Sequence, residues 1–250
     1  MAQGKPAVAK RILIAAVIVL AALACAAAWW VNDCYHADSE ALAVVADANG
    51  TSDGVTVQEL SDGAIAFVPE NPKAGFIFYP GAKVQPEAYA PLMLQCAERG
   101  ILCVIVRPPF NLAILDPNAA NGIQGQFPSV SVWAIGGHSM GGVAASDYAS
   151  KHLSAFDAIV YLASYPATDL TAFEGAVLSI AGTNDQVLNH DSYESAADVL
   201  PADTAYISIE GGNHSYFGNY GDQAGDGIAS ISRSEQQRQT ADLIAQIGTR

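Results

Sequence analysis

Eight short, β-rich apolar runs follow one another along the chain, separated by loops and by longer amphipathic stretches. From the third run onward the apolar residues are nearly continuous, which is typical of strands buried on both faces of a parallel sheet. Strands that alternate with helices favour right-handed crossovers and one doubly wound sheet. The runs are Val55–Leu60, Ala64–Pro69, Gly75–Tyr79, Ile101–Val106, Val132–Gly136, Ala158–Ala163, Ala176–Ala181 and Ala205–Glu210.

Four further segments have an amphipathic pattern that indicates helices. They are Pro86–Arg99, Gly141–His152, His190–Leu200 and Ser232–Ile247. The first two apolar runs are close enough in sequence to form an antiparallel hairpin at the sheet edge. The sequence therefore predicts an α/β fold, with a mostly parallel, doubly wound sheet of about eight strands and helices on both faces.

A charge-free apolar run, Ile12–Val31, lies near the N-terminus. As a helix, its twenty residues would span about 30 Å, the thickness of the hydrocarbon core of a bilayer. Trp29 and Trp30 would lie at the membrane interface, and the three basic residues before the run place the N-terminus in the cytoplasm. The sequence thus predicts a single-pass protein of the cell membrane, with its body on the extracytoplasmic side.

These features divide the chain into a basic cytoplasmic head over 1–11, a transmembrane signal-anchor over 12–31, a tether over 32–54 and a folded domain over 55–250. A cleavable signal peptide is the alternative, because Ala24-Cys25-Ala26 offers small residues for cleavage, and the body would then be secreted. The apolar region of a signal peptide is usually only about 7–15 residues long, however, which favours an anchor.

The charge balance restricts the partners. Eleven Lys and Arg against 25 Asp and Glu give a net charge of -14, which argues against binding to nucleic acid or to anionic lipid headgroups. The four cysteines form no CxxC motif or Cys/His cluster that would suggest a metal site. No dinucleotide or P-loop motif is present either, so we expect no cofactor. The sequence leaves the oligomeric state open.

Gly137–Gly141 has the pattern G-x-S-x-G between an expected strand and an expected helix. A sharp strand–turn–helix elbow exposes its serine in a strained backbone conformation, and only small residues fit two positions away on either side. Ser139 is therefore the candidate nucleophile. A glycine-rich turn that merely joins strand to helix is the alternative.

A serine hydroxyl needs a base within hydrogen-bond reach. His214 is the candidate base, because it lies in a flexible loop directly after the last apolar run, where the site of a parallel sheet is usually found. His190 also follows a strand and stays a rival. The other three histidines lie in the tether, in the elbow beside Ser139 and at the end of the elbow helix.

Asp185 is the candidate acid that would orient the histidine. It follows the run Ala176–Ala181 in a polar loop and lies between the serine and the histidine in sequence, the order expected for this type of triad. Asp169 and Asp191 are rivals, each more easily explained as a carboxylate at a helix start. Backbone N–H groups must stabilise the oxyanion of an acyl-transfer intermediate, and Met140 and Ala82 are the candidate donors.

The chain resembles the α/β-hydrolase superfamily and, within it, the small bacterial hydrolases of the dienelactone-hydrolase-like, "alpha/beta hydrolase fold-5" group. The resemblance covers about residues 55–247 and implies the α/β-hydrolase fold, a triad of Ser139, Asp185 and His214, and Ala82 and Met140 as oxyanion donors. Dienelactone hydrolases proper use a cysteine nucleophile, so their specificity does not transfer to a chain with serine. The resemblance to this group is carried by the segments YPGAKVQPEAYAPL, RPPFNLAILDP, WAIGGHSMGG, LASYPATDL, SIAGTNDQV and EGGNHSYFGNYGDQAGDG.

The function expected from these residues is that of a membrane-tethered serine hydrolase, carboxylesterase-like, acting on a small-molecule ester or related acyl compound. Two alternatives stay open: an acyltransferase with the same triad, and a non-catalytic binding protein on a hydrolase scaffold. Leu162–Gly175 is too short for a large lid, so we expect an open site with an aromatic rim. The expected substrate contacts are Tyr79, Phe110, Asn111, Tyr165 and Phe217.

Overall fold

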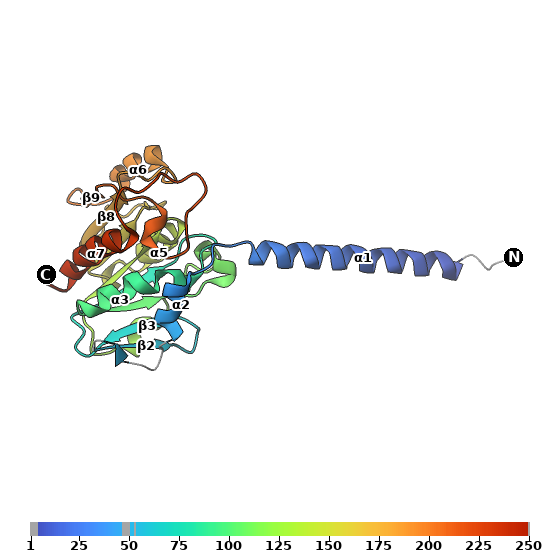
Figure 1. Ribbon diagram of the computed structural model, residues 1–250, viewed down its shortest axis with the longest axis horizontal. Coiled ribbons are helices and arrows are strands. Elements are labelled where there is room, and N and C mark those ends of the chain that lie inside the picture. Colours follow the sequence, from blue (N-terminus) through green and yellow to red (C-terminus); the bar gives the residue numbers. More distant parts are fainter. Residues whose placement is uncertain (1–4, 47–50, 53, 250) are drawn as a thin grey trace. The chain divides into compact units, whose positions relative to one another are not determined.

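The computed structural model describes residues 5–46, 51–52 and 54–249. The chain divides into two compact units, Met1–Cys34 and Tyr35–Arg250. The described part of the first unit is dominated by one helix, α1 (Lys5–Asn32), which is unbroken along its length (Figure 1). Within α1, Ala9–Asn32 has a mean hydropathy of 2.7 and no buried residues, and among the described residues it is the one helix long and apolar enough to cross a membrane. The apolar helix expected near the N-terminus is therefore present.

The second unit is built on one sheet, whose strands within the described residues number nine. Its order is β1-β2-β3-β5-β4-β6-β7-β8-β9. The pairs up to β3–β5 are antiparallel and all later pairs are parallel. The strands are β1 (Thr51–Ser52), β2 (Val55–Glu59), β3 (Ile65–Pro69), β4 (Ala74–Tyr79), β5 (Ile101–Ile105), β6 (Trp133–His138), β7 (Ala158–Leu162), β8 (Ala176–Gly182) and β9 (Ala205–Ile209).

All eight strands expected from the sequence are present, and the expected hairpin is the antiparallel pair β2–β3. The two-residue β1 is an addition at the edge of the sheet. The mostly parallel, doubly wound α/β architecture is thus confirmed.

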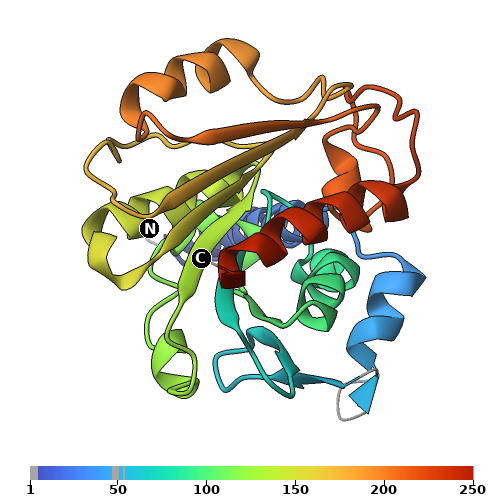
Figure 2. The same ribbon diagram turned by 90° about the vertical axis from the view of Figure 1, so that its left-hand side faces the viewer.

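Helices cover both faces of this sheet (Figure 2). Successive strand residues point to opposite faces: in β4, Phe76 and Phe78 join the core beneath α2, α3 and α7, while Ile77 and Tyr79 join the core beneath α5. The helices of this unit are α2 (Ser39–Ala46), α3 (Ala90–Glu98), α4 (Ile123–Gln126), α5 (Met140–Lys151), α6 (His190–Ser195) and α7 (Arg233–Ile244).

The segment 32–54, expected to be a tether, contains folded structure. Helix α2 lies within it, and the compact unit begins at Tyr35. The backbone of Tyr35 pairs with Val84, and the Asp38 N–H donates to the carbonyl of Asn219 over 2.8 Å. The segment is short and rich in alanine, and it is the contact with distant residues that makes α2 stable, since a helix of eight residues does not persist alone.

The parallel strands place their carboxyl ends at one edge of the sheet. The loops that follow β4, β6, β8 and β9 therefore converge there, and they carry Ala82, Ser139, Asp185 and His214. Residues 163–175 between β7 and β8, all of them described, form turns and bends without a helix. No lid is inserted at this position, as the length of the segment predicts.

Candidate active site

Ser139 lies at the turn between β6 and α5 and has φ 52° and ψ -127°. A positive φ is strained for a residue with a side chain, and such strain is concentrated at functional sites. The two glycines of the motif make the turn possible, because a Cβ atom on Gly137 would lie 2.5 Å from the carbonyl oxygen of Tyr79 and one on Gly141 would lie 2.1 Å from it. The expected elbow is therefore formed.

Hydrogen bonds hold the elbow in this conformation. The Ser139 N–H donates to the carbonyl of Leu162 at the end of β7 over 2.9 Å. The Ser139 carbonyl accepts from the hydroxyl of Ser164 over 2.5 Å and from the Gly142 N–H over 3.1 Å. The backbone groups are satisfied, and Ser139 lines the cavity described below.

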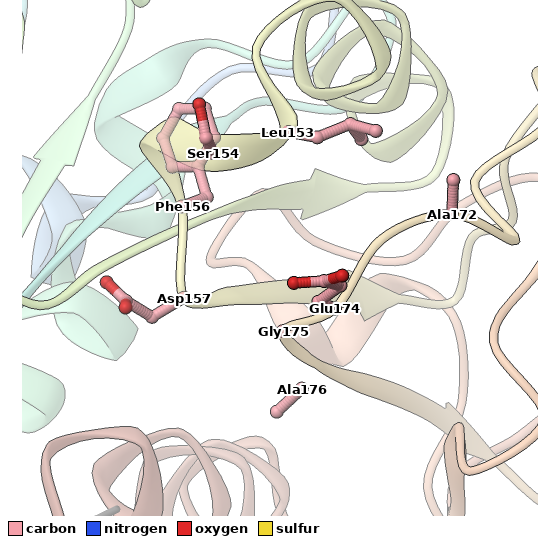
Figure 3. A pocket seen from close by; sticks show the side chains of 8 residues that line it. All are labelled: Leu153, Ser154, Phe156, Asp157, Ala172, Glu174, Gly175 and Ala176. Atoms are coloured by element: carbon pink, nitrogen blue, oxygen red, sulfur yellow. The ribbon is translucent and has the colours of Figure 1, made fainter.

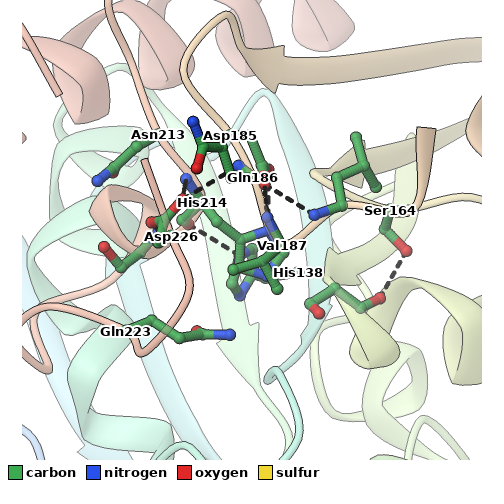
Figure 4. A network of polar contacts seen from close by, with 12 residues as sticks. His138, Ser164, Asp185, Gln186, Val187, Asn213, His214, Gln223 and Asp226 are labelled. Atoms are coloured by element: carbon green, nitrogen blue, oxygen red, sulfur yellow. Dashed lines mark hydrogen bonds and ion pairs between the residues drawn. The ribbon is translucent and has the colours of Figure 1, made fainter. Parts of the chain in front are cut away.

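His214 and Asp185 are in direct contact. Nδ1 of His214 lies 2.8 Å from Oδ2 of Asp185, and both side chains are almost completely buried (Figure 4). The other oxygen, Oδ1, accepts from the backbone N–H groups of Val187 and Leu188 over 2.9 and 2.8 Å. The carboxylate is thus fixed on one side by two amides and presents its second oxygen to the imidazole.

The structure places Ser139 and His214 on one cavity but records no hydrogen bond between the Ser139 hydroxyl and the second ring nitrogen of His214. This atom, Nε2, is buried and makes no hydrogen bond with any of the described residues. Ser139 and His214 both border a cavity of about 380 Å³. An imidazole held by a carboxylate at Nδ1 can take a proton at Nε2, and the hydroxyl of Ser139, which lines the same cavity, is the candidate donor.

The loop after β4 adopts the sharp turn that the candidate oxyanion donor Ala82 requires. The Gly81 N–H donates to the hydroxyl of Tyr89 over 3.1 Å, and the Lys83 N–H donates to the carbonyl of Asn111 over 2.7 Å. Lys83 has φ 59°. The neighbours of Ala82 on both sides are therefore fixed by hydrogen bonds, so the orientation of the peptide between them is fixed as well.

The model of the alpha/beta hydrolase family matches residues 75–238, more than half of the chain. The chain belongs to the alpha/beta hydrolase family. No curated protein in the comparison matches the chain.

Two solved structures show the same fold as this hydrolase family member. Est1E from Butyrivibrio proteoclasticus has a TM-score of 0.54 and 12% sequence identity, with 79% of this chain and 100% of that chain covered. A predicted CIB-like hydrolase from Thermoplasma acidophilum has a TM-score of 0.55 and 17% identity, with 77% and 99% covered. At these identities the likeness concerns the fold, and the site has to be argued from the residues of this chain.

Asp226 is a site residue that sequence reasoning missed. Its carboxylate accepts from the backbone N–H groups of Gln186, His214, Ser215 and Gly227 over 3.4, 3.2, 2.8 and 2.8 Å (Figure 4). One side chain therefore binds both the loop of Asp185 and the loop of His214. Its position in a glycine-rich loop shortly after His214 was the available signal, but a single aspartate in a loop predicts no particular contact.

A second unexpected feature is the buried side chain of His138, directly before Ser139. The ring of His138 lies beside that of His214, with 4.5 Å between centroids and an angle of 51° between the ring planes. The carbonyl of His214 can only accept, so Nε2 of a neutral His138 donates to it over 3.1 Å. Nδ1 of His138 then accepts from the hydroxyl of Tyr89 over 2.8 Å, and the same hydroxyl accepts from the Gly81 N–H. This chain of hydrogen bonds joins the loop of Ala82 to His214.

Burial lowers the pKa of His138 well below its usual range, and the neighbouring imidazole of His214 lowers this pKa further. The folded protein therefore keeps His138 neutral at a pH where the unfolded chain binds a proton. Because the unfolded state then holds more protons, stability is expected to fall as the pH drops below about 6.5, by up to about 1.4 kcal/mol per pH unit from this group.

We expect His138→Gln to remove this contribution, even where the variant is less stable at neutral pH. The measurement is the unfolding free energy from urea titrations at a series of pH values between neutrality and about pH 5. His152→Gln at the exposed end of α5 is the control and should keep the original slope. If the unfolding free energy of His138→Gln depended on pH as steeply as that of the native chain, this dependence could not be assigned to His138.

The structure corrects part of the expected substrate rim. Tyr79 and Phe217 are fully buried. The Tyr79 hydroxyl donates to the carbonyl of Pro117 over 2.8 Å, and Phe217 packs in the core beside the ring of His138. Both face the interior because the strand end and the histidine loop turn these rings toward the helices, so neither borders the cavity.

Of the other three expected substrate contacts, one lines the cavity and two do not. Tyr165 does line the cavity. Phe110 is exposed, and the backbone carbonyl of Asn111 accepts a hydrogen bond from the Lys83 N–H. Neither residue lines the cavity. The lining residues that the sequence did not indicate are mainly apolar: Ile114, Val143, Ala163, Ala167, Val187 and Leu188.

The rival candidates lie away from the cavity. Asp169 is exposed, and its carboxylate accepts from the N–H and hydroxyl of Thr171, which lowers its pKa. Asp191 is exposed in the first turn of α6. His190 bonds through Nε2 to the backbone carbonyl of Asp185 over 3.0 Å and does not line the cavity.

A larger cavity, of about 580 Å³, lies elsewhere (Figure 3). It is bordered by Asp157 and Gly175, which directly precede β7 and β8, and thus lies at the amino ends of these strands. It contains none of the candidate catalytic residues. Within the described part of the chain, no group of three or more His, Cys, Asp or Glu side chains could hold a metal ion.

Proposed function

We propose that the protein is a membrane-tethered serine hydrolase that cleaves an ester or related acyl bond through an acyl-enzyme intermediate. One observation carries this proposal. Ser139, in a strained elbow, borders the same cavity as His214, whose opposite ring nitrogen contacts the buried carboxylate of Asp185 at 2.8 Å. The membership in the alpha/beta hydrolase family supports it.

In the acylation step, Oγ of Ser139 attacks the carbonyl carbon of the substrate while Nε2 of His214 takes the hydroxyl proton. The carbonyl oxygen becomes an oxyanion, which the N–H groups of Ala82 and Met140 stabilise. The bond between carbon and leaving group then breaks, and His214 returns the proton to the departing oxygen. Asp185 stays ionised and stabilises the imidazolium that forms in between.

In the deacylation step, water attacks the acyl-enzyme and His214 takes its proton. The second tetrahedral intermediate collapses, His214 protonates Oγ of Ser139, and the carboxylic acid leaves. The same residues would serve a transfer to an alcohol or amine, because the two reactions differ only in which nucleophile reaches the acyl-enzyme.

We further propose that α1 anchors this domain in the membrane, with the domain on the extracytoplasmic side. The length and apolarity of α1 support the anchor. The three basic residues before the apolar run support the orientation.

A fluorophosphonate probe tests the proposed chemistry. We expect the native chain in detergent to be modified covalently, with the adduct on the peptide that contains Ser139, and the heat-unfolded chain to stay unmodified. The adduct is located by mass spectrometry. Failure of the native chain to react, or an adduct on another serine, would contradict the serine-hydrolase proposal and favour a binding protein.

Product analysis then separates hydrolysis from transfer. With an activated ester and increasing amounts of a small alcohol, a hydrolase should release mainly the free acid at low alcohol concentration. An acyltransferase would form the new ester in preference to the acid despite the excess of water.

A further inference from the structure

Two cavities meet beside Ser139. The first cavity is the one of about 380 Å³ that Ser139 and His214 line, and a second cavity, of about 240 Å³, adjoins it. Four residues line both cavities, so the two meet along these side chains. The shared residues are Ile114, Met140, Val143 and Ala167. The second cavity extends from there along α5 and contains neither Ser139 nor His214.

The lining of this second cavity is mainly apolar. Besides the four shared residues it includes Pro117 and Ala144, with Asp147 and Thr168 as its polar members. Asp147 is ion-paired with Lys151 over 2.9 Å at the surface, so its carboxylate already has a partner. The surroundings therefore suit a hydrocarbon chain better than a charged group.

Apolar side chains at this place are unusually exposed. Ile114 is 59% exposed and Met140 is 39% exposed. Leu115, next to Ile114, is exposed as well. A single exposed apolar residue needs no explanation, but a group of them beside a reactive serine indicates a surface that a ligand covers.

The position of His214 decides which part of a substrate this surface takes. His214 has to protonate the leaving group, so the alcohol must lie on its side of the cavity. Val187, Leu188 and Asn189 line the first cavity together with His214, and none of them lines the second cavity. The second cavity therefore shares its lining with the other part of the first cavity, which is the part left for the acyl group.

We propose that the second cavity binds the distal methylene groups of an unbranched aliphatic acyl chain, so that the enzyme prefers medium-chain acyl esters to acetyl esters. This inference rests on the proposed function and adds the substrate class to it. Each additional methylene group that enters the cavity contributes apolar burial, which is felt in the transition state as well as in the bound substrate. The first carbons of the chain lie in the first cavity and are common to all substrates.

The test compares nitrophenyl esters from acetate to dodecanoate on the full chain in detergent. We expect kcat/KM to rise about fourfold per methylene over the lengths that fill the second cavity, which corresponds to about 0.8 kcal/mol for each buried CH₂. Beyond that length it should level off. A second series, acetate esters of alcohols of increasing length, should show a weaker dependence.

Thr168→Phe is the diagnostic variant, because Thr168 lines the second cavity and not the first. A phenyl ring there should lower kcat/KM for octanoate by about 15-fold, the effect of two lost methylene contacts, and leave acetate within about twofold. Thr171→Phe is the matched control on the same loop; it is exposed and lines neither cavity. It should keep the length profile of the native chain.

The outcomes separate this inference from the proposed function. Reaction of Ser139 with the fluorophosphonate together with a flat acyl-length profile would overturn the inference alone. So would a dependence on alcohol length in place of acyl length, or a Thr168→Phe profile identical to that of the control. Absence of both labelling and ester turnover would overturn the proposed function and the inference with it.

Discussion

Replacement of Ser139 by alanine is expected to lower kcat for an activated ester by about 10⁶-fold, because loss of the nucleophile removes the whole acyl-enzyme route. The substitution should leave the fold intact. The backbone hydrogen bonds of Ser139 to Leu162, Ser164 and Gly142 do not involve its hydroxyl, and alanine fits where serine does. Residual turnover from the oxyanion donors is expected to remain above the rate in water.

The measurement is steady-state ester hydrolysis, with the thermal unfolding midpoint as a check on folding. Ser150→Ala on the same helix is the matched control, since among the described residues its hydroxyl bonds only to the carbonyl of Asp147, over 3.0 Å. It should retain full activity. Near-native turnover in Ser139→Ala would show that another group is the nucleophile.

Replacement of Asp185 by asparagine is expected to lower kcat by about 10⁴-fold, the effect typical of this substitution in a triad. The structure gives the reason. Oδ1 would still accept from the N–H groups of Val187 and Leu188, so the new amide NH₂ would take the place of Oδ2 and donate to Nδ1 of His214. The imidazole would then carry its proton on Nε2 and could not accept one from Ser139.

Asp191→Asn is the control for charge, because it makes the same substitution on an exposed carboxylate of α6. Its activity should match that of the native chain. A small effect of Asp185→Asn combined with a large one of Asp191→Asn would transfer the role of the acid to Asp191. The two outcomes are separated by the ratio of the two kcat values.

The sheet could be predicted almost completely from the sequence because its central strands, β4, β5, β6 and β7, are buried on both faces. Continuous apolar runs such as Ile101–Val106 have few alternatives, and they coincide with β5 and its neighbours to within two residues at each end. Helix α2 could not be predicted in this way. Its stability comes from contacts with residues such as Asn219, far away in the sequence, and no local pattern encodes such contacts.

The candidate site could likewise be predicted in part: the positions of its residues could, and the directions of individual side chains could not. Ser139, Asp185 and His214 each follow a strand, and the topology of a parallel sheet brings such positions together. The direction of individual side chains depends on packing, which explains why Tyr79, an aromatic residue at a strand end, is buried beneath a helix. The contacts of Asp226 likewise arise only when two loops meet.

The four hydrogen bonds that the Asp226 carboxylate accepts from backbone N–H groups also have a consequence for the synthesis of the protein. A ribosome completes the elbow and the loop of Asp185 while residues 214–226 are still unmade. Until Asp226 emerges, the loop of His214 lacks the side chain that ties it to the loop of Asp185. The candidate site can therefore be completed only after Asp226 has left the ribosome.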